Sequence, residues 1–191
     1  YKEDIYVGYR YFETFAPEKV IYPFGYGLGY TDFEIKTLSA EANGNEFVFR
    51  LSVTNSGKQC GREVAQLYLA KPCGKLGNPE KVLVDFAKTA SLKPGESAEL
   101  ILKAERESLA SYDESGATGF ESAYVIEKGE YRFFVGKNVR DCECALEYLQ
   151  DGDELYRQCT QASAPIQAFD VLAAEDKNGN RIRTSRTVRT R

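Results

Sequence analysis

Apolar and polar residues alternate most clearly along Glu46–Thr54. The period of two places Phe47, Phe49, Leu51 and Val53 on one face, which predicts a strand with one buried face. Turn-forming residues follow at 55–57, and the next stretch, 63–69, carries apolar side chains on both faces. This second pattern is typical of a central strand in a sheet, so we expect the rest of the chain to add strands to this pair.

Strands are also predicted on both sides of this pair. Phe33–Ala42 precedes it, and Asn43-Gly44 is a signal for a type I′ hairpin turn. Later segments with strand character are Lys81–Leu92, Ser97–Ala104, Glu121–Glu127, Glu130–Val135 and Cys142–Leu149. Loops are expected at 71–80 and 113–119, a Pro-Gly turn at 93–96 and a helical turn at 106–112. About eight short strands predict an all-β fold, an immunoglobulin-like or fibronectin type III-like antiparallel β-sandwich.

The two ends of the chain have a different character. An aromatic N-terminal segment predicts a strand at Ile5–Tyr11, and residues 22–31 alternate Gly with aromatic or aliphatic residues. A strand rather than a helix follows these glycines, so an extended connector anchored by its aromatic side chains is favoured over a phosphate-binding loop. Residues 151–165 predict a polar linker, and Val171–Val188 predicts a second hairpin around Asn178-Gly179.

Composition narrows the chemistry. A hydrophobic fraction of 42% with 28% charged residues is typical of a globular protein, and no apolar run approaches the length of about 20 residues that a membrane span needs. The absence of His excludes Ser-His and Cys-His nucleophile pairs and His-containing metal sites. The absence of Met indicates a piece of a longer protein.

The five cysteines show no CxxC spacing and are predicted to be reduced thiols, with a four-cysteine metal site or a disulfide framework as alternatives. They favour a cytoplasmic over a secreted location. Asp176, Asn178 and Asn180 match the start of a calcium loop, but Arg181 replaces its required Gly, which favours a simple turn. The cysteines are Cys60, Cys73, Cys142, Cys144 and Cys159.

Charge is distributed unevenly. Residues 177–191 hold six basic and no acidic residues, which leaves 19 basic and 29 acidic residues before them. Such a tail fits nucleic acid, but we favour a strand or linker that pairs with an acidic face of the parent protein. The loop and strand carboxylates Asp85, Asp113, Glu114 and Glu121 are interpreted as solvated charges, because a glycosidase needs two carboxylates facing each other across a substrate.

Two aromatic runs, YVGYRYF and YPFGYGLGYTDF, precede the predicted sandwich. They resemble the junction in glycoside hydrolase family 3, the β-glucosidase family, where the α/β sandwich domain leads into a fibronectin type III-like domain. The later runs VTNSG, GREVAQLYL, VLVDFAK, LKPGES, LASYD and EKGEYRFFVG follow in the same order and spacing. The resemblance covers about residues 1–150. One departure is Gly29, where the family usually has Ser.

This resemblance implies three parts: the end of the α/β sandwich domain with a linker (1–32), a fibronectin type III-like domain (33–150), and a linker, hairpin and basic tail (151–191). The tail is similar to members with a permuted domain order, in which it would lead toward the (β/α)8 barrel. The family's nucleophile and acid/base lie in the barrel and the α/β sandwich domain, and no motif for either is found here. A non-catalytic accessory domain without catalytic residues, metal or cofactor is therefore expected.

The expected partners are the barrel and α/β sandwich domains of the same polypeptide, with β-glucosides or oligosaccharides reached through the parent enzyme and with neither nucleic acid nor membrane. Two alternatives remain open, a carbohydrate-binding module and a generic immunoglobulin-like interaction domain. Exposed aromatic side chains serve sugar stacking and domain packing alike. The candidate contact residues are Tyr9, Tyr11, Tyr22, Phe24 and Tyr26.

Overall fold

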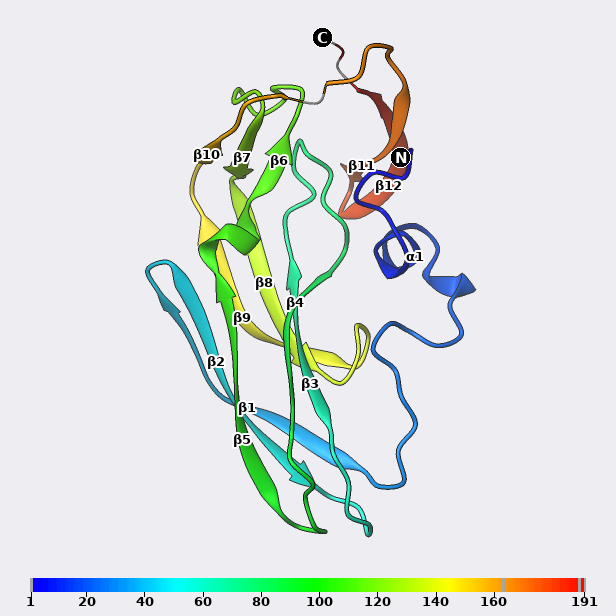
Figure 1. Ribbon diagram of the computed structural model, residues 1–191, viewed down its shortest axis with the longest axis vertical. Helices are drawn as coiled ribbons and strands as arrows, with labels where there is room; N and C mark the ends of the chain where they lie inside the picture. Colours follow the sequence, from blue (N-terminus) through cyan, green and yellow to red (C-terminus); the bar gives the residue numbers. More distant parts are fainter. Residues whose placement is uncertain (1, 163, 189, 191) are drawn as a thin grey trace.

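Two antiparallel sheets face each other and bury the alternating apolar residues of the sequence (Figure 1). The computed structural model describes residues 2–162, 164–188 and 190. The first sheet, ordered β1-β2-β5, contains β1 (Phe33–Asn43), β2 (Glu46–Asn55) and β5 (Ser97–Glu105). The second sheet, ordered β4-β3-β8-β9, contains β3 (Val64–Ala70), β4 (Val82–Lys88), β8 (Gly129–Gly136) and β9 (Cys142–Gln150). The predicted all-β sandwich is confirmed.

The core lies between these sheets. Phe47 and Phe49 of β2 pack against Phe133 of β8, with ring centroids 4.7 and 5.2 Å away. All three side chains are at most 1% exposed. Burial of an aromatic or aliphatic side chain of this size stabilises a fold by about 1.5–3 kcal/mol. β3 buries both faces, as its pattern predicts: Leu67 and Leu69 face the core, and Gln66 and Tyr68 lie against the connector backbone at Gly25 and Phe24.

The first hairpin turn lies one residue later than predicted. Asn43 still pairs with Glu46, so the turn residues are Gly44 and Asn45. Gly44 has a φ of 62°, whereas Asn45 is not among the residues with positive φ. Positive φ at the first turn position alone is the pattern of a type II′ turn, in which Gly is the preferred first residue.

A third, smaller sheet includes part of the segment predicted to be a polar linker, so this prediction is wrong for that part. Its order is β10-β7-β6, with β6 (Ser111–Asp113), β7 (Ala123–Ile126) and β10 (Glu154–Gln158). β10 lies inside the segment expected to be a linker and pairs with β7, whose Ala123 and Val125 are fully buried. The residues of β10 are mostly exposed, so the strand lacks the apolar alternation that would identify it in the sequence.

The N-terminal segment is helical, and the predicted strand at Ile5–Tyr11 is wrong. Helix α1 spans Tyr9–Phe15, and a short 3-10 helix, η1, follows at Pro17–Lys19. The ring of Phe15 packs against those of Tyr11, at 5.5 Å, and Tyr6, at 4.8 Å. Tyr11 and Phe15 are four residues apart, which places them on one helix face.

The predicted C-terminal hairpin is confirmed and packs beside α1 (Figure 1). It consists of β11 (Asp170–Lys177) and β12 (Asn180–Thr187). Both turn residues, Asn178 and Gly179, have positive φ, at 58° and 81°, as a type I′ turn requires. A second apolar cluster joins this hairpin to the N-terminal segment through Tyr6, Cys73 and Ala174 with Tyr11, Phe15 and Leu172. The predicted helical turn is also present, as η2 (Arg106–Leu109).

A buried asparagine ties the start of β1 to the end of β2. The Asn55 amide nitrogen donates to the carbonyls of Gln59, at 2.7 Å, and Leu92, at 2.9 Å. Its Oδ1 accepts hydrogen bonds from the Gly57 amide, at 3.1 Å, and from Thr31 Oγ1, at 2.9 Å. The side chain is 0% exposed, so water cannot replace these partners.

Replacing Asn55 with Ala should therefore lower the free energy of unfolding by about 2–3 kcal/mol, because several buried polar groups lose their partners. Denaturant-induced unfolding followed by circular dichroism measures this change. Asn43→Ala, at an exposed position with only a 3.5 Å contact to Glu41, is the matched control and should change stability by less than about 0.5 kcal/mol. Equal effects of the two variants would contradict the assignment.

Candidate interdomain surface

Two of the five candidate aromatic residues hold the N-terminal segment on the sandwich. The rings of Tyr9 and Phe24 stack at 4.2 Å with an interplanar angle of 15°. The Tyr9 hydroxyl accepts a hydrogen bond from the Leu83 amide at 2.9 Å, and the Phe24 carbonyl accepts one from the Val139 amide at 3.0 Å. These contacts link α1 and the connector to β4 and to the loop after β8.

Tyr11 lies at the contact between α1 and the C-terminal hairpin. The Arg183 guanidinium of β12 lies 5.7 Å from the Tyr11 ring and donates a 3.1 Å hydrogen bond to its hydroxyl. Tyr11 also packs edge to face against Phe12, at 5.4 Å. Its ring therefore has partners within the chain.

Tyr22 and Tyr26 form an exposed pair on the connector. Their rings stack at 5.2 Å and 29°, and the two residues are 70% and 44% exposed. Gly25, between them, has a φ of 85°, and a Cβ there would lie 2.3 Å from the Gln66 side chain. At Gly25 the connector backbone thus lies directly against the Gln66 side chain of β3.

The connector, residues 20–32, runs along the sandwich from η1 to β1 (Figure 1). It is hydrogen-bonded to the sandwich through Phe24, Thr31 and Asp32. Tyr30 does not anchor it, contrary to the prediction, because it is 99% exposed; the adjacent Thr31 makes the contact through its hydroxyl to Asn55. Ile21 and Leu28 are 85% and 89% exposed. We call Ile21, Tyr22, Leu28 and Tyr30 the connector face.

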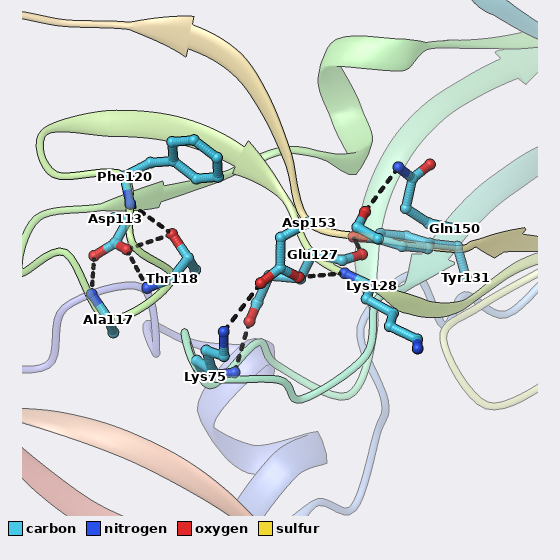
Figure 2. A network of polar contacts seen from close by, with 11 residues as sticks. Lys75, Asp113, Ala117, Thr118, Phe120, Glu127, Lys128, Tyr131, Gln150 and Asp153 are labelled. Atoms are coloured by element: carbon cyan, nitrogen blue, oxygen red, sulfur yellow. Dashed lines mark hydrogen bonds and ion pairs between the residues drawn. The ribbon is translucent and has the colours of Figure 1, made fainter.

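Buried carboxylates hold the loops at one end of the sandwich (Figure 2). Asp113, at the end of β6, is 0% exposed and accepts hydrogen bonds from the amides of residues 115–118 and the hydroxyls of Ser115 and Thr118. Burial on its own would raise the pKa of Asp113, but the hydrogen bonds from Thr118, Gly116 and Ala117 outweigh it and lower the pKa.

Glu127, after β7, holds the loop at 71–80 in a similar way. It is 3% exposed and accepts hydrogen bonds from the Lys75 amide, at 2.6 Å, and the Asn78 amide group, at 3.5 Å. Burial raises its pKa, and the backbone donors oppose that shift. Beside it, Asp153 bridges the Lys75 ammonium, at 3.0 Å, and the Lys128 amide, at 2.8 Å (Figure 2).

The carboxylates interpreted as solvated charges divide into two groups. Glu121 is exposed, as expected, whereas Asp113 is a buried structural acceptor. Asp85 is half-buried and accepts the Lys103 amide of β5 at 2.8 Å, which joins the edges of the two main sheets. Glu114 is half-buried, and burial raises its pKa. The interpretation was wrong for Asp113 and Asp85 because hydrogen bonds from neighbouring amides do not appear in a sequence pattern.

Basic residues of β12 bind the N-terminal half of this same chain. The Arg181 guanidinium donates to the carbonyls of Asn78, at 2.8 Å, and Lys71, at 2.7 Å, and pairs with Glu80. Arg186 pairs with Asp4 at 2.7 Å. Two other basic residues of the tail, Arg189 and Arg191, lie outside the described residues.

The described residues hold no group of three or more His, Cys, Asp or Glu side chains arranged for a metal ion. All five cysteines carry free thiols, and Cys73 is the buried one. Asp176 accepts the Gly179 amide at 2.8 Å as part of the hairpin turn. In residues 2–162, 164–188 and 190, no helix has the length and apolar character to span a bilayer.

Comparison with known proteins gives a consistent result. A family described as fibronectin type III-like domain matches residues 63–139. A β-glucosidase of Ruminococcus albus is 44% identical over 171 residues, covering 88% of this chain and 18% of the relative. β-Glucosidase A of Butyrivibrio fibrisolvens is 48% identical over 168 residues, covering 79% and 20%. The chain thus spans about a fifth of the length of the curated relatives it matches.

Solved structures agree with these matches. A β-glucosidase from Paenibacillus barengoltzii superimposes with a TM-score of 0.96 and 41% identity over 100% of this chain and 22% of its own. β-Glucosidase 3B from Thermotoga neapolitana gives a TM-score of 0.71 and 37% identity over 82% of this chain and 21% of its own. The first match includes the C-terminal hairpin, whereas the second leaves part of this chain unmatched.

Replacing Asp113 with Asn should lower the free energy of unfolding at pH 7 by about 1–3 kcal/mol, because an amide cannot accept all the hydrogen bonds that the carboxylate accepts. The pKa of Asp113 is lower in the folded chain than in the unfolded chain. Its contribution to stability is therefore complete above the unfolded pKa of about 3.9 and is lost as pH falls through the folded value.

Denaturant unfolding from pH 7 to pH 2.5 should thus show the largest difference between wild type and Asp113→Asn near neutral pH and a diminishing one below about pH 4. Asp32→Asn, at an exposed position, is the matched control and should show no such pH dependence. A constant difference over the whole range would refute the role of the Asp113 charge.

The ordered motifs, the two-sheet sandwich and the matches over most of the chain point to one family. The match to a single domain description, residues 63–139, runs from β3 to the loop after β8 and includes strands of both main sheets and of the third, smaller sheet. The chain contains a fibronectin type III-like domain, and its homologues are β-glucosidases of glycoside hydrolase family 3.

Proposed function

We propose that this chain is a non-catalytic accessory unit of a β-glucosidase-like family 3 glycoside hydrolase, and that it stabilises the catalytic domains by packing against them. The observation that carries the proposal is the connector face. Its four side chains are 70–99% exposed, although the connector that bears them is hydrogen-bonded to the sandwich through Phe24, Thr31 and Asp32. Apolar side chains held outward on an ordered segment are typical of a surface that another domain covers.

The proposed partners are the (β/α)8 barrel and the α/β sandwich domain of the same polypeptide. The relatives are about five times as long as this chain, which leaves room for both domains. Residues 1–32 would complete the α/β sandwich domain, and Tyr9 and Phe24 would fix the orientation of that domain on the fibronectin type III-like sandwich. Covering each side chain of the connector face would stabilise the assembly by about 1.5–3 kcal/mol before entropic costs.

A permuted domain order, with the barrel after this chain, is part of the proposal. The match to the Paenibacillus barengoltzii enzyme covers the whole chain, and the match to the Thermotoga neapolitana enzyme covers 82% of it. This difference supports a C-terminal extension that only some family members carry. The segment from Asp151 onward, with the hairpin of β11 and β12, would then belong to the bridge toward the barrel.

Sugar binding by the chain itself is the second candidate, and the exposed Tyr22 and Tyr26 pair favours it. A sugar ring stacks on a free aromatic face, which Tyr22 offers at 70% exposure. The two rings also cover each other, at 5.2 Å, so the free area is limited. We rank domain packing above sugar binding because Ile21 and Leu28, beside the pair, are aliphatic and add nothing to stacking.

We also infer a cytoplasmic location, which the five free thiols support, since thiols in a secreted domain of this size usually pair.

Serine substitutions at Ile21, Leu28 and Tyr30 test domain packing. In the intact polypeptide, the triple variant should lower the melting temperature by several degrees, because the apolar contacts with the catalytic domains are lost. In the isolated chain it should leave the melting temperature within about 1 °C, since these side chains are already exposed. Differential scanning calorimetry measures both.

The matched control is Leu149→Ser, at a 68% exposed position on β9 away from the connector. It should have no effect in either protein. If the triple variant behaved like Leu149→Ser in the intact polypeptide, the proposed packing would be wrong.

The isolated chain should neither hydrolyse an aryl β-glucoside nor bind cellobiose. The neighbouring carboxylates Glu127 and Asp153 are both bonded to Lys75, and Asp4, which lies near Glu114, pairs with Arg186. Neither pair is free to act on a substrate in the way a retaining enzyme needs. Release of the aryl alcohol and isothermal titration with cellobiose give the two measurements. Saturable binding that Tyr22→Ala removes would instead establish the sugar-binding candidate.

A further inference from the structure

A cavity lined by three cationic side chains, Arg10, Lys71 and Arg186, lies apart from the connector face. Its volume is about 660 Å³, and its walls come from the N-terminal segment, the loop before β4 and residues 107–114. Arg10 of α1 and Lys71, directly after β3, both line it. The other walls are largely apolar, with Leu76, Val82 and Tyr124 among them.

Lys71 is held in place without a carboxylate. Its ammonium donates to the Ala110 carbonyl at 2.5 Å and to Ser111 Oγ at 3.2 Å. Among the described residues it has no ion pair. Burial, assisted by the charge of Arg10 and opposed by that of Glu127, lowers the pKa of Lys71 to about 8. An ammonium has three protons to donate, so one remains available for an anion.

Arg10 has no hydrogen bond or ion pair through its side chain within the described part of the chain. The acidic residues of the cavity do not neutralise it. Asp4 pairs with Arg186 at 2.7 Å, and Glu107 pairs with Arg157 at 2.9 Å. Glu114 interacts electrostatically with Arg186 and Asp4 rather than with Arg10 or Lys71. Arg10 and Lys71 thus repel each other and neither is paired with a carboxylate of the cavity lining; Glu127, which acts on Lys71, lies outside that lining.

We propose that Arg10 and Lys71 form a seat for a carboxylate side chain that the remainder of the polypeptide inserts into this cavity. A planar guanidinium beside an ammonium suits a carboxylate, which accepts two parallel hydrogen bonds from arginine. The remainder of the polypeptide is the source because the relatives are about five times as long as this chain. Tyr9, the neighbour of Arg10, contacts the connector through Phe24, so the seat continues the proposed interface and rests on that proposed function.

The chemistry of the seat can be tested on the chain alone. Competitive labelling with trace acetic anhydride, read by peptide mass spectrometry across pH, gives the pKa of Lys71. Sodium acetate should raise that pKa by about one unit relative to sodium chloride at equal ionic strength, because an anion beside the ammonium favours its charged form. Arg10→Gln should abolish the difference between the salts, and Arg50→Gln, at an exposed position on β2, should keep it. Identical curves in the two salts would overturn the carboxylate seat.

The source of the carboxylate is tested in the intact polypeptide. Arg10→Gln should lower its melting temperature by about 2 °C or more, yet leave unchanged or raise that of the isolated chain, where it removes repulsion between unpaired cations. In the intact polypeptide, acetate should no longer raise the pKa of Lys71, because the inserted carboxylate already occupies the seat. Two results together would contradict an inserted side chain and indicate a cavity that binds free anions. Acetate would still raise the pKa of Lys71 in the intact polypeptide, and Arg10→Gln and Arg50→Gln would have the same melting temperature. The serine variants of the connector face test domain packing separately, so the two failures are distinguishable.

Discussion

Packing of Phe47 and Phe49 against Phe133 is the contact on which the other parts of the structure depend. It joins the central strand of one sheet to a central strand of the other, with all three rings almost fully buried. The connector ends on the first of these sheets, and the loop at 71–80 joins two strands of the second. Because apolar contacts hold the two sheets together, charged and hydrogen-bonding side chains are found mainly in the loops rather than in the core.

Most of these polar side chains hold loops in place. Asp113 and Glu127 are buried anions that organise loops through backbone amides, which offsets the cost of removing a charge from water. The arginines of β12 act similarly when Arg181 binds the carbonyls of the 71–80 loop. Arg10 and Lys71 differ from these groups, since they are half-buried and neither is paired with a carboxylate of the cavity lining.

Prediction from the sequence succeeded where pattern and burial coincide. The alternation in β2, the two-faced character of β3 and the Asn-Gly turn of the second hairpin each reflect a local rule. It failed where contacts distant in the sequence decide. Tyr9 and Tyr11 suggest a strand, but the segment forms a helix whose Tyr11 and Phe15 pack into a cluster with Cys73 and Ala174. The polar strand β10 forms only because β7 offers it a partner.

The candidate aromatic residues show the same division. Their abundance in the first 30 residues was evident in the sequence, and so was the family of the sandwich, because turn chemistry and apolar period are encoded locally. Which rings are internal anchors, such as Tyr9 and Phe24, and which face outward, such as Tyr22, was decided by the tertiary structure. The physical reason is that exposure and charge balance depend on neighbours far along the chain, as the unpaired Arg10 next to Lys71 illustrates.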